Sequence, residues 1–510
     1  MMKSYKFFLI TVLIMTVVFL TPSCDSILDD PQQQQIVLSG VDYTNTPQMK
    51  QLIQGAYYNL YDIQWETFPL ISVRGDDVNA QGDQEPLLET EAFRYNRSFW
   101  MYNSTWLNLY SDIINWYSII EELGKFNEYA ADPALGNQYI AEIKVMQSYE
   151  LLLLARVWGG LLIPTSSQTN TLYEAPITPF DEVMQYISDE MDGAIPLLST
   201  VAPNERGLVP GGITVHTALA IKAMANLEMK NWQGVADATG QIISSGKFQL
   251  FPDYYELFKT PGKLADENIL EFQYSDFGEG NGAGVRYLQA FFGPNNWTPE
   301  VDGISPGWGF WEPSLKYITF MLDRGETDRL ETTVLFTDQG IDSLEARGYT
   351  SLPAFVSSTT RDNDAIGNTN GNPNPRAIFT SGKHYLPSNQ MIPGRTEYGS
   401  NKNFICIRYS EILLMHAEAL VSGASSSAMS ADEAVNTVRT RAGLAGISGV
   451  TIDDVLDEKF AEFGMEWGIR YYDLVRHDKT SELTGYSADK RFLPYPLPQI
   501  DLLPQLDTGS

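Results

Sequence analysis

Apolar residues recur at intervals of three and four along much of this chain, and this spacing constrains the fold more than any other feature of the sequence. A period of 3.6 residues places such positions on one face of an α-helix, and Pro or Gly residues stand near the ends of the patterned segments. These segments are residues 47–61, 105–123, 137–157, 179–198, 408–421, 431–442 and 453–476. The sequence therefore predicts a mostly helical protein.

Residues 214–246 form the clearest unit, in which two helical patterns are separated by a short turn at Asn231. Small and branched apolar residues line one face of each pattern: Ala218, Leu219, Ala223, Ala225 and Leu227, then Val235, Ala238, Ile242 and Ile243. Small residues at this spacing let two helices approach closely, as in tetratricopeptide repeats of about 34 residues. No regular run of copies has this period, so we predict a scaffold of divergent tetratricopeptide-like helix pairs.

The N-terminus has the layout of a secretory leader. Lys3 and Lys6 precede an apolar run over residues 7–20, and a short polar stretch separates this run from Cys24. The run is too short to cross a bilayer of about 30 Å, and a basic start with a short apolar centre is typical of a cleaved leader. It resembles a bacterial lipoprotein signal, in which Cys24 becomes the lipidated first residue of the mature chain. The alternative is an ordinary secreted protein in which this cysteine is coincidental.

The chain is strongly acidic, with a net charge of −30. Removing residues 1–23 removes Lys3 and Lys6 and no acid, so the mature charge is −30 − 2 = −32. Binding to nucleic acid phosphates needs a basic surface, and we therefore exclude nucleic acid as a partner. A hydrophobic content of 43% in 510 residues is enough for a large core, which excludes a disordered chain.

The sequence pattern changes between residues 248 and 401, where short strand-like runs such as 269–274 alternate with Gly-rich and Pro-rich loops. We predict a helical scaffold that carries a loop-rich, partly β ligand-binding face. The expected organisation has four parts: a signal peptide at 1–23, a lipidated N-terminus and tether at 24–46, an N-terminal helical region at 47–250, and a C-terminal region with variable binding loops at 251–510.

Four motifs follow one another in the second half of the chain: IRYSEILLMHAEA at 407–419, VNTVRTRAGL at 435–444, GIRYYDLVR at 468–476 and LPYP at 493–496. In this order they resemble the C-terminal signature of the SusD/RagB nutrient-uptake lipoproteins of the Bacteroidetes. Residues 74–77, 146–164 and 266–270 also resemble landmarks of this family. The likeness covers nearly all of the mature chain and departs only at residues 506–510.

The resemblance implies tetratricopeptide-like pairs packed under a loop-rich face. It also implies that the protein binds a nutrient glycan, or less often a peptide, at the cell surface and delivers it to a SusC-like TonB-dependent barrel in the outer membrane. No cofactor is expected. We interpret the charged signature residues as structural ion pairs on amphipathic helices: Arg408, Glu411, Glu418, Arg470, Asp473 and Arg476.

Aromatic residues in loops are the candidate ligand-binding residues, because a sugar ring stacks its C–H face on an aromatic ring and needs polar side chains at its edge. Residues 287–311 are rich in them, and the candidates there are Tyr287, Trp297, Trp308 and Trp311, with Asn296 as a polar partner. A second candidate patch contains Trp100 and Tyr102. By contrast, Trp106 and Trp232 lie in helical patterns and are expected to be packing residues.

Enzyme motifs are weak in this sequence. Gly303 to Gly307 fits G-x-S-x-G, but Pro306 has no N–H to serve as an oxyanion donor after Ser305. The four histidines show no metal-binding spacing, and we predict no metal site. A surface glycan hydrolase, which needs two carboxylates across a cleft, stays open as the alternative function.

Overall fold

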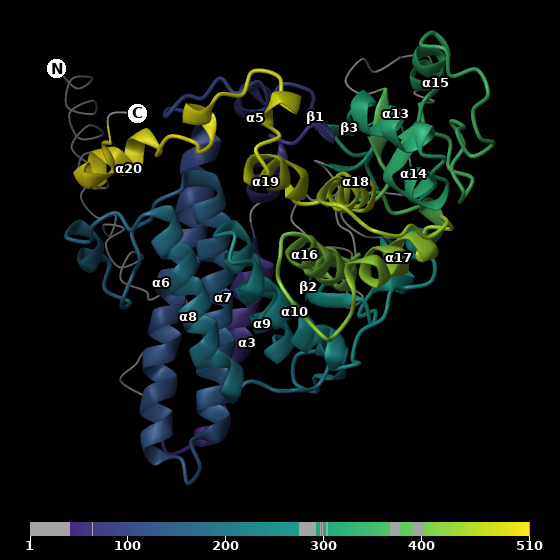
Figure 1. Cartoon of the computed structure of the whole chain (residues 1–510). Helices are drawn as coiled ribbons and strands as arrows, with labels where there is room; N and C mark the ends of the chain where they lie inside the picture. The colour runs from purple at the N-terminus through teal and green to yellow at the C-terminus, as the bar shows by residue number, and fades with distance from the viewer. Residues whose placement is uncertain are drawn as a thin grey trace, which may run out of the picture. The chain divides into compact units, whose positions relative to one another are not determined.

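A computed structural model describes residues 41–63, 65–274, 292–295, 297, 299–301, 304–367, 378–391 and 402–508. The chain divides into a first unit, Met1–Thr46, and a second compact unit, Pro47–Ser510. Helices dominate the second unit and its strands are short, so the predicted mostly helical fold is confirmed (Figure 1). Among the described residues, no helix combines the length and the apolar character needed to span a membrane.

Long helices build the first half of this unit. Their bounds are Met49–Tyr61 (α3), Trp100–Tyr129 (α6), Ala134–Trp158 (α7), Phe180–Ala194 (α8), Val215–Glu228 (α9) and Trp232–Ser244 (α10). Consecutive helices from α6 to α10 pack against one another, and α10 then packs against a helix of the second half, Tyr409–Val421 (α16). Figure 1 shows α6, α7 and α8 side by side.

The central helix of this bundle is α7. Nearly every residue from Ala141 to Trp158 is buried, including the run Leu151 to Leu154. A helix that is buried on all sides must be covered by other elements on all sides, and α7 contacts α3, α6, α8 and α9.

The predicted helix pair at residues 214–246 is confirmed as α9 and α10. Thr214 caps α9 by accepting a hydrogen bond from the backbone N–H of His216, and Asn231 caps α10 by accepting one from Gly234. Polar caps of this kind satisfy N–H groups that have no partner inside the helix. The turn between the helices therefore follows from local chemistry.

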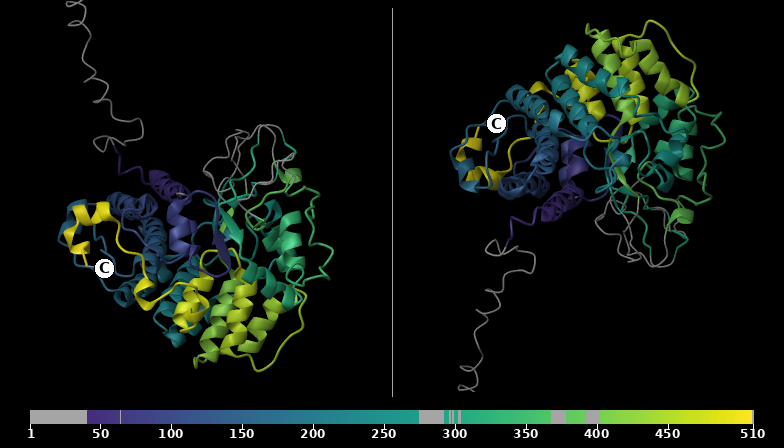
Figure 2. Two further views of the ribbon diagram at one scale, coloured as in Figure 1. Left: turned by 90° about the horizontal axis from the view of Figure 1, so that it is seen from above. Right: turned by 90° about the horizontal axis from the view of Figure 1, so that it is seen from below.

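The second half combines shorter elements. Its helices, and the short ones that precede it, are Thr67–Ser72 (α4), Glu85–Glu91 (α5), Tyr254–Leu257 (α11), Leu315–Asp323 (α13), Asp328–Thr333 (α14), Asp338–Glu345 (α15), Ala431–Arg441 (α17), Ile452–Phe463 (α18), Ile469–Arg476 (α19) and Leu497–Leu502 (α20). Both views of Figure 2 place the blue bundle helices on one side and the green segment with α13 to α15 on the other.

Three antiparallel strand pairs connect distant parts of the chain. They join Val78–Ala80 (β1) to Trp311–Pro313 (β3), Asn268–Phe272 (β2) to Phe404–Arg408 (β6), and Val334–Phe336 (β4) to Phe379–Ser381 (β5). The strand expected at residues 269–274 is β2. Each pair closes a long loop, so the strands fix where the variable segments leave the scaffold.

The prediction of one helix over residues 453–476 is wrong. The segment forms two helices, α18 and α19, with a break from Gly464 to Gly468. At Gly464 an added Cβ would overlap the buried ring of Tyr317, and Gly468 has a positive φ of 80°. Glycine suits the positive φ of Gly468, because it has no Cβ.

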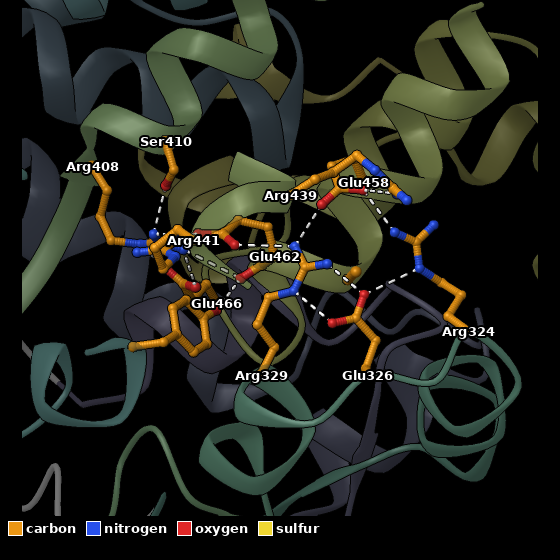
Figure 3. A network of polar contacts seen from close by, with 12 residues as sticks. Arg324, Glu326, Arg329, Arg408, Ser410, Arg439, Arg441, Glu458, Glu462 and Glu466 are labelled. Carbon is orange, nitrogen blue, oxygen red and sulfur yellow. Dashed lines mark hydrogen bonds and ion pairs between the residues drawn. The ribbon is translucent and has the colours of Figure 1, made fainter. Parts of the chain in front are cut away.

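A buried network of arginines and glutamates joins α14, α17, α18 and β6 (Figure 3). Arg408 donates to Glu267 and Glu462, each at 2.7 Å, and to Glu466 at 2.8 and 2.9 Å. Arg329 is fully buried and bridges Glu326, Glu458 and Glu462. The network ties the C-terminal helices to the strand pair β2–β6.

The ion pairs predicted for the signature residues are confirmed, with one exception. Arg476 binds Glu418 and Asp473, and Arg470 binds Asp76. Most partners come from other elements, and among the described signature residues Arg476 and Asp473 pair within one helix. Glu411 is the exception: it makes no ion pair within the described part of the chain, and burial raises its pKa to about 7.

Candidate functional site

Three tryptophans from distant parts of the chain gather at the surface around Phe310. We call Trp65, Trp100 and Trp308, with Phe310 beneath them, the tryptophan surface. The side chain of Trp100 is 49% exposed, Trp65 and Trp308 are partly buried, and Phe310 is buried. The ring centres of Trp65 and Trp100 are 6.0 Å apart, and those of Trp308 and Phe310 are 5.7 Å apart.

The scaffold holds this surface from two sides. Trp100 is the first residue of α6, and Trp65 lies just before α4. The carbonyl of Phe310 accepts a hydrogen bond of 2.9 Å from the backbone N–H of Gln81, which extends the β1–β3 pairing by one residue. The short strand pair therefore brings the loop of Trp308 and Phe310 to the N-terminal part of the chain.

Carboxylates brace the elements behind the tryptophan surface. Glu312 accepts a hydrogen bond of 2.6 Å from the side chain of Gln81, and Glu91 accepts one of 2.9 Å from the N–H of Ala80. Glu66 accepts a hydrogen bond from the hydroxyl of Ser104 on α6. Burial, with a contribution from the charge of Glu312, raises the pKa of Glu91 to about 7. Burial also raises the pKa of Glu312 and so favours its uncharged form.

Three of the sequence candidates are buried, and the expectation that their rings are accessible is wrong. Trp311 is 1% exposed because its position in β3 turns the ring into the core, where it contacts Phe292. Trp297 is 2% exposed and packs edge-on against Tyr385. Tyr102 is fully buried because it lies two positions after Trp100, on the opposite side of α6.

The structure brings together two candidates that the sequence places in separate patches, Trp308 and Trp100. Tyr287, Asn296 and Cys24 lie outside the described residues. Sequence reasoning missed Trp65, although a tryptophan between the first helix and a following proline has the loop context that marked the others. The expected packing role of Trp106 is confirmed, since it is 2% exposed. Trp232 is half-buried and stacks on His477.

Within the described ranges, no group of three or more His, Cys, Asp and Glu side chains is arranged to hold a metal ion. In the loop from Asp362 to Gly367, the side-chain carboxylates accept hydrogen bonds from tyrosine hydroxyl groups. Asp362 binds the hydroxyl of Tyr255, and Asp364 binds that of Tyr385. These carboxylates are thus committed to the fold.

Comparisons with known proteins place the chain in a family. The SusD family model matches residues 236–492, just over half of the chain. A SusD-like protein of Bacteroides ovatus is 22% identical over 91% of this chain and 81% of its own length. SusD-like protein P38 of Formosa agariphila is 24% identical over 95% of this chain and 94% of its own length.

Solved structures share the fold. Surface glycan-binding protein A from Bacteroides thetaiotaomicron superposes with a TM-score of 0.73 and 20% identity, over 91% of this chain and 98% of that one. A laminarin-binding SusD-like protein superposes with a TM-score of 0.71 and 20% identity, over 88% and 96%. From its matching family model, its relatives and its fold, the chain belongs to the SusD family.

Proposed function

We propose that this protein binds a nutrient glycan at the cell surface and stacks it on the tryptophan surface. The observation that carries the proposal is the exposed Trp100, which lies beside Trp65 at the edge of a scaffold shared with glycan-binding proteins. A group of aromatic rings that reaches the surface, with one ring exposed to solvent, is typical of an interaction site. A sugar ring is a suitable ligand, because its C–H face packs on an indole while its hydroxyl groups reach polar side chains.

The expected affinity can be worked out from Trp100. Its side chain is 49% exposed, and a Trp offers roughly 250 Å² in total, so about 120 Å² is available to a ligand. A sugar that covers one face removes about half of this area from water, worth about 1.5 kcal/mol at roughly 25 cal/mol per Å². Two or three such rings give weak to moderate binding, which suits a protein that must release its ligand.

The geometry favours binding over hydrolysis. A glycosidase needs a general acid and a second carboxylate placed across an open cleft. Near the tryptophan surface, Glu91 and Glu312 hold β1 and β3 through hydrogen bonds, and Glu312 is only 6% exposed. Carboxylates committed to the scaffold are poorly placed to protonate a glycosidic oxygen.

We further propose that the ligand passes to a SusC-like TonB-dependent barrel, and that a lipid on Cys24 holds the protein on the outer membrane. The SusD family assignment supports this partnership, and the short leader supports the anchor. Co-purification of a barrel protein with the tagged mature chain from its own membranes tests the partnership. A chain recovered alone under mild detergent would contradict it.

The binding proposal is tested by incubating the purified mature protein with libraries of oligosaccharides and peptides. We expect a glycan to be retained without release of shorter products. Trp100→Ala should then weaken binding of the retained glycan by about tenfold. Tyr129→Ala is the matched control, because Tyr129 is 58% exposed at the other end of the same helix.

Three results would change the conclusion. Shorter products would favour the hydrolase, and selective retention of peptides would favour a peptide ligand. Equal affinity of Trp100→Ala and the unmodified protein would move the site away from the tryptophan surface. The melting temperature of each variant shows whether the comparison concerns folded protein.

A further inference from the structure

A cavity lies where α7, α9 and α19 end. Its volume is about 120 Å³. Since a water molecule needs only roughly 10–15 Å³ on this measure, the space can hold a small anion or part of a larger ligand. The cavity is lined by the rings of Phe180, Tyr471, Tyr472 and Phe492, by Val475, by the cations Arg156, Lys230, Arg476 and Arg491, and by the carboxylates Glu228 and Asp478.

The lining of this cavity carries a net positive charge, although the chain as a whole is strongly acidic. Four cations and two carboxylates give a local charge of 4 − 2 = +2, whereas the whole chain carries −30. Lys230 and Asp478 are exposed, with side-chain exposures of 49% and 90%, and mark the rim. The interior is therefore dominated by arginines and aromatic rings.

Two of the arginines have structural partners. Arg156 lies in the last turn of α7 and pairs with Glu228 at 2.9 Å. Arg476 lies in the last turn of α19 and pairs with Glu418 at 2.8 Å. A cation near a helix C-terminus also stabilises the carbonyl groups that end the helix. Arg156 and Arg476 therefore have a structural role in the fold.

Arg491 is different, because the described residues give it no ion pair. Its guanidinium lies 5.0 Å from the ring centre of Phe180 and 4.8 Å from that of Phe492. The two rings hold it in place through cation–π contacts. These ring contacts supply no carboxylate to the N–H groups of Arg491.

Behind the cavity, Arg74 adds a second guanidinium that has no ion pair among the described residues. Arg74 is 1% exposed and donates to the backbone carbonyls of Arg491 at 2.8 Å and Arg156 at 3.3 Å. Its guanidinium lies 4.2 Å from the ring centre of Tyr471, which lines the cavity. A buried charge without a counter-charge is costly, and an anion in the cavity would reduce that cost.

We propose that this cavity binds an oxyanion group, a carboxylate or a sulfate, with Arg491 as its main donor. The planar guanidinium can offer two parallel N–H groups to such an anion. Phe180 and Phe492 give an apolar wall for a carbon skeleton attached to it. Two sources share this chemistry: an acidic sugar, and free inorganic sulfate. The inference does not rest on the proposed function, because it concerns different residues.

Calorimetric titration of the mature protein in detergent, at constant ionic strength, tests the proposal. The probes are sodium sulfate, sodium D-glucuronate and neutral D-glucose. We expect saturable binding of at least one anion and none of glucose. Tighter binding of glucuronate identifies an acidic sugar as the fitting ligand, and tighter binding of sulfate identifies the inorganic anion.

Arg491→Gln should weaken anion binding by about tenfold or more, because it removes a charged donor. Arg491→Lys, which keeps the charge without the planar fork, should bind with intermediate affinity. Arg347→Gln is the control for net charge, since Arg347 is exposed just after α15 and its guanidinium donates to Ser343 in the described structure. The proposal is overturned if neither anion binds, or if folded Arg491→Gln binds as the unmodified protein does.

Discussion

Replacing Arg408 with methionine should be among the most damaging single changes to this fold. Arg408 is 1% exposed, and its guanidinium donates to three buried glutamates, Glu267, Glu462 and Glu466. Removing one partner of a buried ion pair typically costs about 3–5 kcal/mol, since the other charge stays buried. Arg441 still pairs with Glu267 and Glu462. We therefore expect the lower end, about 3 kcal/mol, out of a typical total of about 5–15 kcal/mol.

The stability lost in Arg408→Met should depend on pH, because Glu466 can take up a proton in the variant. Burial alone would raise the pKa of Glu466, but Arg408 and Lys383 together hold it below its usual range. Without Arg408, one of the two cations that lower the pKa of Glu466 is missing, so burial raises this pKa. The carboxyl group of Glu466 then takes up a proton more readily in acid. Protonation removes the part of the Glu466 charge that Arg408 no longer neutralises, while Lys383 stays beside it. The variant should therefore lose less stability at pH 5 than at pH 8.

Urea denaturation of the mature protein at both pH values measures this effect. Arg347→Met, at an exposed position, should change the free energy of unfolding by less than about 0.5 kcal/mol. Adding Glu466→Gln to Arg408→Met should restore part of the loss, because it removes a buried carboxylate that has lost Arg408 and keeps Lys383 as its partner. A cost below about 1 kcal/mol, or strict additivity of the two substitutions, would refute the reasoning.

Three further outcomes follow from single sites. Burial raises the pKa of Asp77 to about 7, so ionising it destabilises the fold as pH rises from about 4 to 7; Asp77→Asn should flatten the fall in melting temperature between pH 5 and 8, and an unchanged slope would contradict this. Gly464→Ala should cost about 1–3 kcal/mol in urea denaturation because its Cβ overlaps the buried ring of Tyr317; an unchanged midpoint would show that the ring can move aside. Cys24→Ala should move the protein from the membrane pellet to the soluble fraction, and a variant that still pellets after a high-salt wash has another anchor.

Local patterns predicted most of the helices but not the break between α18 and α19. The pair α9 and α10 followed from apolar spacing and from the turn at Asn231, and the structure adds the caps Thr214 and Asn231. The periodicity of residues 453–476 continues through Gly464 and Gly468, so spacing alone suggested one helix. The break depends on the close approach of Tyr317, which comes from a distant part of the chain.

The candidate site was harder to predict, because exposure is decided by packing between distant segments. Trp308 and Trp311 lie in one loop-rich stretch, yet the pairing of β1 with β3 buries the second and leaves the first at the surface. Trp100 and Tyr102 differ only by their positions around α6. Trp65 reaches the same surface from another segment, which no local pattern could indicate.

A crystal structure of the protein with the oligosaccharide retained from the library shows whether a glycan stacks on the tryptophan surface. We predict a sugar ring packed against the indole of Trp100, with Trp65 or Trp308 in contact with the same ligand. The glycan bound elsewhere, with Trp100 still open to solvent, would contradict the account.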